Sequence, residues 1–170
     1  YFAFLNKLSV DLGGISGMLA TQEESTCFHN RDLETGCAIC YESVYGEYFA
    51  SFVEKGAKVM FVITNDGWWG DTPGYRQHLR FSRLRAIETR RSIGRSANTG
   101  ISALINERGD ITAQTLWDEE CMLSGELTLN DRTTLFVRYG DITGRASTGV
   151  FLLSLLYFFA YRRRKKDYIV

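Results

Sequence analysis

The stretch GCAICYESVYGE, residues 36–47, decides the fold because its hydrophobic pattern changes period at Cys40. The small and apolar residues before Cys40 are typical of the end of a buried strand. After it, Val44, Tyr48 and Phe52 follow at intervals of four, which predicts a helix. A side chain at such a bend can point out of the sheet edge, where the first N–H groups of the helix can stabilise a thiolate or an oxyanion. Cys40 therefore stands in the position of a nucleophile.

A simpler interpretation of Cys40 stays open at this point. A free cysteine is often a small buried hydrophobic residue without chemistry. Cys37 and Cys40 form a C-x-x-C, but residues three apart in a strand lie about 10 Å apart, too far for a disulfide. His29 and His78 are not at zinc-ligand spacing, and no second C-x-x-C follows. The pattern therefore predicts neither a redox pair nor a metal site.

A second strand is predicted over residues 58–64, KVMFVIT, a short apolar run rich in β-branched residues. Strand, helix and strand within about 25 residues form a βαβ unit, whose parallel strands end at the same edge of the sheet. The loop NDGWWG, residues 65–70, would then share a crevice with Cys40. We expect Trp68 and Trp69 to form a wall of an apolar pocket. The alternative is an ordinary Asn-Asp-Gly turn with two aromatic side chains on the surface.

A helix is predicted from Gly74 to Arg95, with Leu79, Leu84 and Ile87 on one side and seven arginines over the rest. So many arginines in one helix suggest phosphate binding. The stronger interpretation is a solvated face whose arginines pair with Glu88 and other acids.

The rest of the chain reads as a mixture of elements. A polar turn at residues 96–102 leads into strands, with a hairpin turn at 106–110. Parallel and antiparallel strands combined with helices indicate an α/β or α+β protein. The further predicted elements are a helix over 4–12, a long loop over 15–35, and antiparallel strands over 101–105, 111–116 and 122–129.

Residues 146–161, ASTGVFLLSLLYFFAY, contain no charge and are followed by RRRKK at 162–166. As a helix they span about 24 Å, slightly less than the ~30 Å hydrocarbon core, and Arg145 and Arg162 can extend the span by snorkelling. A buried globular helix would not need the basic block, which the positive-inside rule expects on the cytoplasmic side. We therefore predict one transmembrane helix, with the folded domain on the opposite face.

Composition narrows the function classes. Twenty basic and twenty acidic residues cancel, which argues against a nucleic-acid partner. Four cysteines without paired spacing do not define a disulfide framework. The chain begins at Tyr1 without an initiator Met, so we expect an internal start or a fragment.

Four motifs follow one another along the chain: ICYES at 39–43, ITNDGWWGDTPGYRQH at 63–78, RLRAIETRR at 83–91 and SANTGIS at 96–102. Together they resemble the C-terminal part of the apolipoprotein N-acyltransferases, a membrane-bound branch of the carbon–nitrogen hydrolase (nitrilase) superfamily. The resemblance covers nearly the whole chain. It implies the C-terminal part of an α-β-β-α sandwich over residues 1–144, and a transmembrane helix with a basic tail over residues 145–170.

The resemblance also implies roles for individual residues. The superfamily uses a Glu as general base, a Lys that stabilises the oxyanion and a Cys that forms a thioester. Cys40 would be the nucleophile, the backbone N–H of Tyr41 an oxyanion donor, and Glu42 an organiser of the site. The family's Glu and Lys lie upstream of the region that matches Tyr1, and Lys7 lacks the Tyr-His-Lys context of the catalytic Lys. We therefore expect this chain by itself to be inactive.

For substrate binding we expect contributions from Asn65, Trp68, Trp69 and His78, although a lone histidine is more often structural. The resemblance implies transfer of an acyl group from a phospholipid, through the Cys40 thioester, to the N-terminal amine of a diacylglyceryl-cysteine lipoprotein. Neither a metal nor an organic cofactor is implied. The enzyme would lie in the bacterial inner membrane, with a periplasmic catalytic domain and a cytoplasmic C-terminus.

Two other function classes stay open from the sequence. A soluble amidase or nitrilase, which hydrolyses a carbon–nitrogen bond, would share the Cys40 core but would not need the apolar tail. A membrane-anchored binding domain without enzymatic activity would lack the upstream Glu and Lys.

Overall fold

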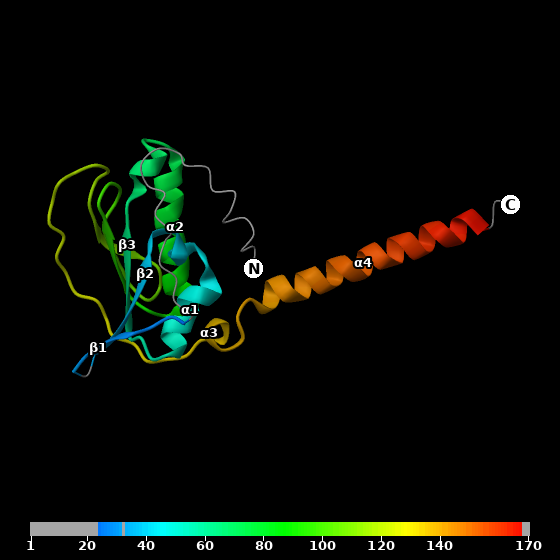
Figure 1. The fold of residues 1–170 in the computed structure, drawn as a ribbon, viewed down its shortest axis with the longest axis horizontal. Coiled ribbons are helices and arrows are strands. Elements are labelled where there is room, and N and C mark those ends of the chain that lie inside the picture. Colours follow the sequence, from blue (N-terminus) through cyan, green and yellow to red (C-terminus); the bar gives the residue numbers. More distant parts are fainter. Residues whose placement is uncertain (1–23, 32, 168–170) are drawn as a thin grey trace, which may run out of the picture.

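A computed structural model of the chain describes residues 24–31 and 33–167, around a six-stranded sheet in the order β1-β2-β3-β4-β5-β6 (Figure 1). β2, β3 and β4 run parallel, and the remaining neighbours pair antiparallel. The strands are β1 (Phe28–Asn30), β2 (Leu33–Ile39), β3 (Val59–Thr64), β4 (Ile93–Ala97), β5 (Ala103–Ile105) and β6 (Ile111–Gln114). The mixed α/β class is confirmed, and the helix predicted over 4–12 lies outside the described residues.

Two helices, α1 (Gly46–Glu54) and α2 (Pro73–Thr89), lie on the same side of the sheet (Figure 1). α1 completes the predicted β2–α1–β3 crossover, and its apolar residues Phe49 and Phe52 are buried in the core. α2 has a clear start signal, because Thr72 Oγ1 accepts a hydrogen bond from the N–H of Gly74 and a proline occupies the first helical position.

The two faces of the sheet are covered differently. The side chains of Ala38, Met60, Val62 and Ile93 point towards the helices and are fully or almost fully buried. On the opposite face Ile39, Phe61 and Ile63 are 61%, 41% and 53% exposed. The described residues thus form one helical layer and one strand layer, which is half of the four-layer sandwich expected from the sequence.

α2 differs from its prediction in length. It ends at Thr89 rather than Arg95, because Arg90 adopts a left-handed conformation with φ 53° and the chain then enters β4 beside β3.

The buried side of α2 also differs from the prediction. Leu79 is buried as expected, but Leu84 and Ile87 are 40% and 43% exposed. The side chains buried beside Leu79 are mostly polar: Tyr75, His78, Ser82, Arg85 and Thr89. Apolar spacing did not identify this face because most of its polar side chains find hydrogen-bond partners inside the protein, although the buried hydroxyl of Ser82 has none among the described residues.

Two further predictions fail for reasons of strand pairing. The loop expected over 15–35 contains β1 and the start of β2, which form an antiparallel pair with Phe28 opposite Thr35. β1 is a short edge strand held by backbone pairing, so it shows no apolar alternation. The strand expected over 122–129 is irregular, and its first residue, Met122, is 94% exposed. Alternating apolar residues do not form a strand when no ladder partner lies beside them.

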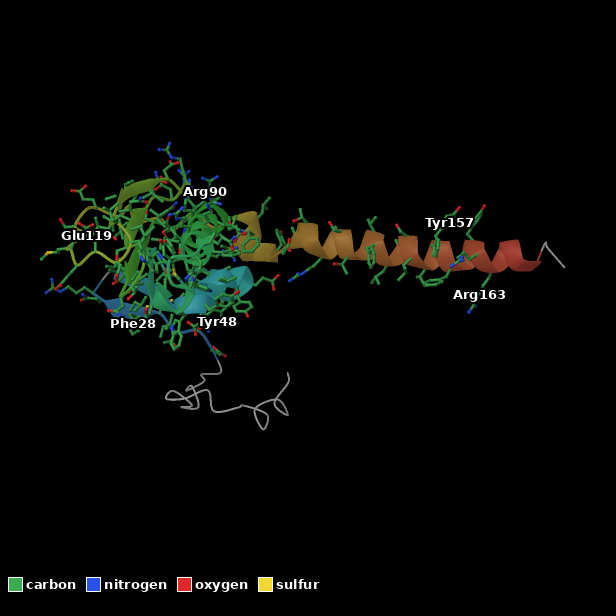
Figure 2. The ribbon with its side chains drawn as sticks, turned by 90° about the horizontal axis from the view of Figure 1, so that it is seen from above. Phe28, Tyr48, Arg90, Glu119, Tyr157 and Arg163 are labelled. Carbon is green, nitrogen blue, oxygen red and sulfur yellow. The ribbon has the colours of Figure 1, made fainter. Side chains whose placement is uncertain are left out.

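The last helix, α4 (Ile142–Asp167), follows the short α3 (Leu135–Tyr139) and extends away from the domain (Figure 1). Figure 2 shows Tyr157 and Arg163 far from the sheet. Within the described residues, one helical segment, Ile142–Arg163, is long enough and apolar enough to cross a membrane, judged by length and composition alone. None of its most apolar part is buried inside the protein.

Polar contacts hold the start of α4 to α1. Glu47 Oε1 accepts a hydrogen bond from the backbone N–H of Asp141 (3.1 Å) and from Arg145 Nη2 (2.7 Å). The direction in which α4 leaves the domain is therefore tied to the first turn of the helix that follows Cys40.

Candidate active site

Cys40 lies at the bend where β2 ends, as the first residue of the 3₁₀ helix η2 (Cys40–Val44). Its φ of 53° lies in the left-handed region, which is unfavourable for a residue with a side chain. Such strain persists only where the surroundings enforce it, and it gathers at functional sites. The side chain is partly exposed, whereas Ala38 before it is fully buried.

A buried ionic group lies under this bend, at the carboxyl end of β3. Asp66 is fully buried, and the Nη2 group of Arg95 donates to its Oδ2 atom. Its Oδ1 atom accepts from His78 Nδ1 at 2.8 Å and from Thr64 Oγ1 at 3.0 Å. Residues from β3, the loop after it, α2 and β4 thus meet around one carboxylate.

The second nitrogen of His78 reaches the bend itself. His78 Nε2 lies 3.1 Å from Ser43 Oγ and 3.2 Å from the carbonyl oxygen of Cys40. Ser43 Oγ donates to the same carbonyl oxygen at 2.8 Å. The loops after β2 and β3 are therefore joined at one edge of the sheet, as the βαβ argument predicted.

Ser43, His78 and Asp66 are connected in the order of a serine-hydrolase triad, but the burial of Ser43 gives them another role. Ser43 is 0% exposed, so no substrate carbonyl can reach its hydroxyl. Its proton is directed to the carbonyl oxygen of Cys40. The nucleophile favoured by exposure at this edge is the thiol of Cys40.

The charges in this group stabilise one another. Burial by itself raises the pKa of Asp66, but the hydrogen bond from His78 and the charge of Arg95 outweigh it and hold the pKa of Asp66 below its usual range. Burial lowers the pKa of Arg95, although a guanidinium stays protonated at neutral pH. The Asp66 carboxylate is therefore ionised, which requires that His78 Nδ1 carries a proton.

The two cysteines of the C-x-x-C are in different environments. Burial, followed by the charge of the Glu42 carboxylate, raises the pKa of the Cys37 thiol, which disfavours its thiolate. Cys37 and Cys40 are both free thiols, as their spacing predicted. These differences favour Cys40 as the reactive thiol.

Glu42 folds back over the bend. Its Oε2 atom accepts a hydrogen bond from the N–H of Ile39 at 2.7 Å. Burial and then the Glu42 carboxylate raise the pKa of Tyr48 on α1. Glu42 thus stabilises the end of β2, and Tyr41 is 52% exposed beside it. The catalytic roles of Glu42 and Tyr41 stay predictions.

The NDGWWG loop forms the 3₁₀ helix η3 (Asp66–Trp69), and Asn65 Oδ1 accepts from the N–H of Gly67 at 3.0 Å. Trp69 packs edge-on against His78, with ring centroids 5.3 Å apart. Trp68 is 74% exposed. The two adjacent tryptophans therefore point to different environments, and substrate binding by Asn65, Trp68 and Trp69 stays a prediction.

His78 differs from the substrate contact expected from the sequence. It is 2% exposed, and both ring nitrogens contact protein groups. Sequence reasoning also missed Asp66, Ser43 and Arg95 as members of the site. Arg95 could not be found because it was assigned to a helix, and no local pattern distinguishes it from the other arginines.

Three of the seven arginines are buried, contrary to the expected solvated face. Arg85 pairs with Glu88 at 3.1 Å, which confirms that one predicted ion pair. Arg91 donates to the carbonyl oxygens of Ala57 (2.6 Å) and Arg132 (2.8 Å). These arginines bind the backbone and acids of the domain itself.

An open groove of about 1860 Å³ lies beside the bend. Its lining includes Ile39, Glu42 and Tyr48, together with Phe136 of α3 and Arg145 of α4. Cys40 is not among its lining residues, so the groove adjoins the thiol rather than containing it.

Comparison with known proteins places this geometry in a family. Residues 15–135 match the carbon–nitrogen hydrolase family. The chain is 35% identical over 155 residues to an apolipoprotein N-acyltransferase of Chlorobaculum tepidum, covering 88% of this chain and 29% of that protein. An apolipoprotein N-acyltransferase of Geobacter metallireducens is 32% identical, covering 82% and 26% respectively. The chain thus spans less than a third of the length of these curated relatives.

Solved structures agree on the fold. Saccharomyces cerevisiae Nit3, a member of branch 10 of the nitrilase superfamily, gives a TM-score of 0.51 at 23% identity, over 60% of this chain and 40% of that one. A carbon–nitrogen hydrolase from Helicobacter pylori G27 gives 0.50 at 12% identity, over 57% and 41%. β2, in the parallel part of the sheet, ends directly before the partly exposed Cys40. Because residues 15–135 also match the family, this chain belongs to the carbon–nitrogen hydrolase family.

Proposed function

We propose that this chain is the part of an apolipoprotein N-acyltransferase that carries the nucleophile. The observation that carries the proposal is Cys40, a partly exposed thiol held in a left-handed bend at the carboxyl end of a parallel strand. The bend lies within ICYES, in a chain 35% identical to a curated enzyme of that name.

The proposed reaction has two acyl transfers. The Cys40 thiolate attacks the ester carbonyl of a phospholipid, and the resulting oxyanion is held by the Tyr41 N–H and other donors. The tetrahedral intermediate collapses to a thioester, and the lysophospholipid leaves as an alcohol after taking up the proton lost by the thiol. The α-amine of a diacylglyceryl-cysteine lipoprotein then attacks the thioester, loses a proton and becomes an amide, which restores the thiol.

The general base and the oxyanion-stabilising lysine are proposed to come from a part of the enzyme upstream of the region described. The superfamily triad needs a Glu and a Lys, and Lys7 lacks the family context. The exposed sheet face with Ile39, Phe61 and Ile63 supports this arrangement, because an apolar face of this kind is normally covered. Residues 1–144 are proposed to form the C-terminal part of the sandwich. A second strand layer from the upstream region would complete it and bring the Glu and Lys to Cys40.

The membrane placement is proposed from α4. Its candidate span of 22 residues, Ile142–Arg163, is about 33 Å long as a helix, enough for the hydrocarbon core, and its arginines lie near the two ends, where they can snorkel. The basic block after residue 161 favours a cytoplasmic C-terminus and a periplasmic domain in the bacterial inner membrane. An alkaline phosphatase reporter appended after Val170 should be inactive, and activity there would overturn the orientation.

The substrate side of the site is proposed to include Asn65, Trp68 and Trp69. Trp68 is exposed at the edge of the sheet where Cys40 lies. This exposure supports contact with an apolar acyl chain or with the bilayer surface, where tryptophan is favoured. Glu42 is proposed to organise the bend, through its hydrogen bond to the Ile39 N–H.

Mass spectrometry of the full-length enzyme incubated with phospholipid tests the proposal. We expect an added acyl mass that hydroxylamine removes, as a thioester requires, and we expect Cys40→Ala to abolish it. Cys37→Ala is the matched control, because it removes a neighbouring thiol at a packing cost of about 1 kcal/mol. Persistence of the label in Cys40→Ala, or its loss in Cys37→Ala alone, would show that the nucleophile is assigned wrongly.

A further inference from the structure

The buried group under the bend holds a single peptide unit, the one between Cys40 and Tyr41. Two side chains converge on its carbonyl oxygen, Ser43 Oγ at 2.8 Å and His78 Nε2 at 3.2 Å. Both side chains are almost completely buried. The carbonyl therefore points inward, to the side occupied by α2.

The geometry of the peptide bond fixes the opposite end of the same unit. In a planar trans peptide the N–H points away from the C=O, so the N–H of Tyr41 is directed opposite to the Cys40 carbonyl. Because the carbonyl is held inward by His78 and Ser43, the Tyr41 N–H is held outward. This is the donor on which the proposed oxyanion stabilisation depends.

His78 is itself held in place by the group behind it. Asp66 accepts from His78 Nδ1, and Asp66 is fixed by Arg95, by Thr64 Oγ1 and by its own N–H, which donates to the carbonyl oxygen of Thr99 at 2.7 Å. Trp69 packs against the imidazole ring. The ring therefore has little freedom to rotate away from the bend.

We propose that His78, protonated on both ring nitrogens and oriented by Asp66 and Arg95, is a positioning residue that fixes the Cys40–Tyr41 peptide so that the Tyr41 N–H is aimed at the oxyanion. The inference rests on the proposed function, because it assigns a purpose to the predicted oxyanion donor. It differs from a substrate-binding role, since His78 acts through the backbone of the nucleophile and does not touch the substrate.

Two substitutions of His78 distinguish the contact of its Nδ1 atom with Asp66 from the contact of its Nε2 atom with the Cys40 carbonyl. The amide nitrogen of His78→Gln replaces Nε2 and can still donate to the Cys40 carbonyl. The amide nitrogen of His78→Asn replaces Nδ1 and contacts Asp66, but it no longer reaches the bend. Both remove the ring and its packing, so they serve as controls for each other. His29→Asn, at an exposed histidine, is the control for a surface change.

The measurement is the rate of thioester formation by the full-length enzyme, in detergent micelles saturated with dioleoyl phosphatidylethanolamine. A misaligned reacting group or a lost oxyanion donor costs about 10²-fold or more, so we expect His78→Asn to slow the step by roughly 10- to 100-fold. We expect His78→Gln to remain within about threefold of the wild type, since one donor to the carbonyl is kept.

Alkylation of Cys40 by iodoacetamide provides a readout that a general loss of structure would also change. The thiolate displaces iodide from carbon and no oxyanion forms, so the reaction does not need the Tyr41 N–H. We expect the alkylation rates of all three variants to equal that of the wild type to within about twofold. A parallel fall in alkylation and thioester formation in His78→Asn would show a collapsed site and overturn the inference.

Ser43→Ala keeps the test decisive if His78→Asn does not fold. It removes the other donor to the same carbonyl with minimal change in volume, and we expect slower thioester formation with unchanged alkylation. Equal rates for wild type and Ser43→Ala, or for the Asn and Gln variants, would overturn the inference alone. Absence of any thioester in the wild-type enzyme would instead remove the proposed function, and this inference with it.

Discussion

α2 and α4, the two longest helices in the described part of the chain, depart from the usual distribution of side chains in opposite ways. α2 buries His78, Ser82, Arg85 and Thr89 against the sheet and leaves Leu84 exposed. α4 exposes leucine and phenylalanine side chains all around. His78, Arg85 and Thr89 can be buried in α2 because each forms hydrogen bonds inside the protein, and His78 also contacts the bend at Cys40. Apolar residues can be exposed in α4 if its surroundings are a bilayer rather than water.

The comparison shows that burial follows partners and solvent, and not polarity alone. A buried charge is stable only when it is paired and hydrogen-bonded. An exposed apolar helix is stable only when its medium is apolar. Each half of this statement can be tested by a substitution that removes the partner or changes the medium.

Removal of the buried carboxylate should have the largest effect. Asp66→Ala leaves the Arg95 guanidinium buried without its counter-charge, which we expect to lower the free energy of unfolding by about 3–5 kcal/mol. The measurement is the thermal unfolding of the purified full-length enzyme. Asp71→Ala, at an exposed carboxylate five residues later, should shift it by less than about 0.5 kcal/mol. Equal stability of the two variants would show that the buried group is not held by charge.

A charge in the middle of α4 should have the next largest effect. Leu153 is 68% exposed near the centre of the apolar stretch, so Leu153→Lys should disfavour membrane insertion by about 2.5–3.5 kcal/mol. The measurement is the fraction of protein that resists alkaline extraction from membranes. Leu153→Ala, which stays apolar, should resist extraction like the wild type. A Lys variant that is equally resistant would contradict the bilayer as the medium of α4.

Lowering the pH should remove the stabilisation by the Asp66 carboxylate, with a smaller effect on the free energy of unfolding. The folded-state pKa of Asp66 is depressed, so its stabilisation is present above the unfolded value of about 3.9 and is lost as pH falls through the folded pKa. Asp66→Asn lacks this contribution. The difference in unfolding free energy between wild type and Asp66→Asn should therefore be constant from neutral pH to about pH 5 and shrink below about pH 4. A difference that grows in acid would contradict the depressed pKa.

The contact between the domain and α4 should have the smallest effect. Glu47 and Arg145 lie 2.7 Å apart, but their side chains are 55% and 66% exposed, so Glu47→Gln should cost less than about 1 kcal/mol. The same thermal unfolding measures it. A loss above about 2 kcal/mol would show that the pair is shielded from water, for example by lipid headgroups.

Local patterns were sufficient for the parts of this protein whose structure depends on near neighbours. The change of period at Cys40 predicted the bend, the apolar run at 58–64 predicted β3, and the uncharged run at 146–161 lies within α4. Their spacing along the chain predicted a parallel βαβ unit, because a helical crossover of that length is the usual connection between parallel strands. The order of the four motifs also indicated the family.

Tertiary structure decided the features that depend on partners distant in sequence. Asp66, His78 and Arg95 meet only because β3, α2 and β4 converge. The Asp66 carboxylate binds residues 12 and 29 positions further along the chain, and no sequence spacing predicts such contacts. The inward face of α2 is largely polar because His78, Arg85 and Thr89 find hydrogen-bond partners there, and hydrophobic periodicity does not reveal such partners. The same holds for β1, which is a strand because β2 lies beside it. Sequence by itself thus determined the bend and its candidate nucleophile, Cys40, and packing determined which buried groups hold that bend in place.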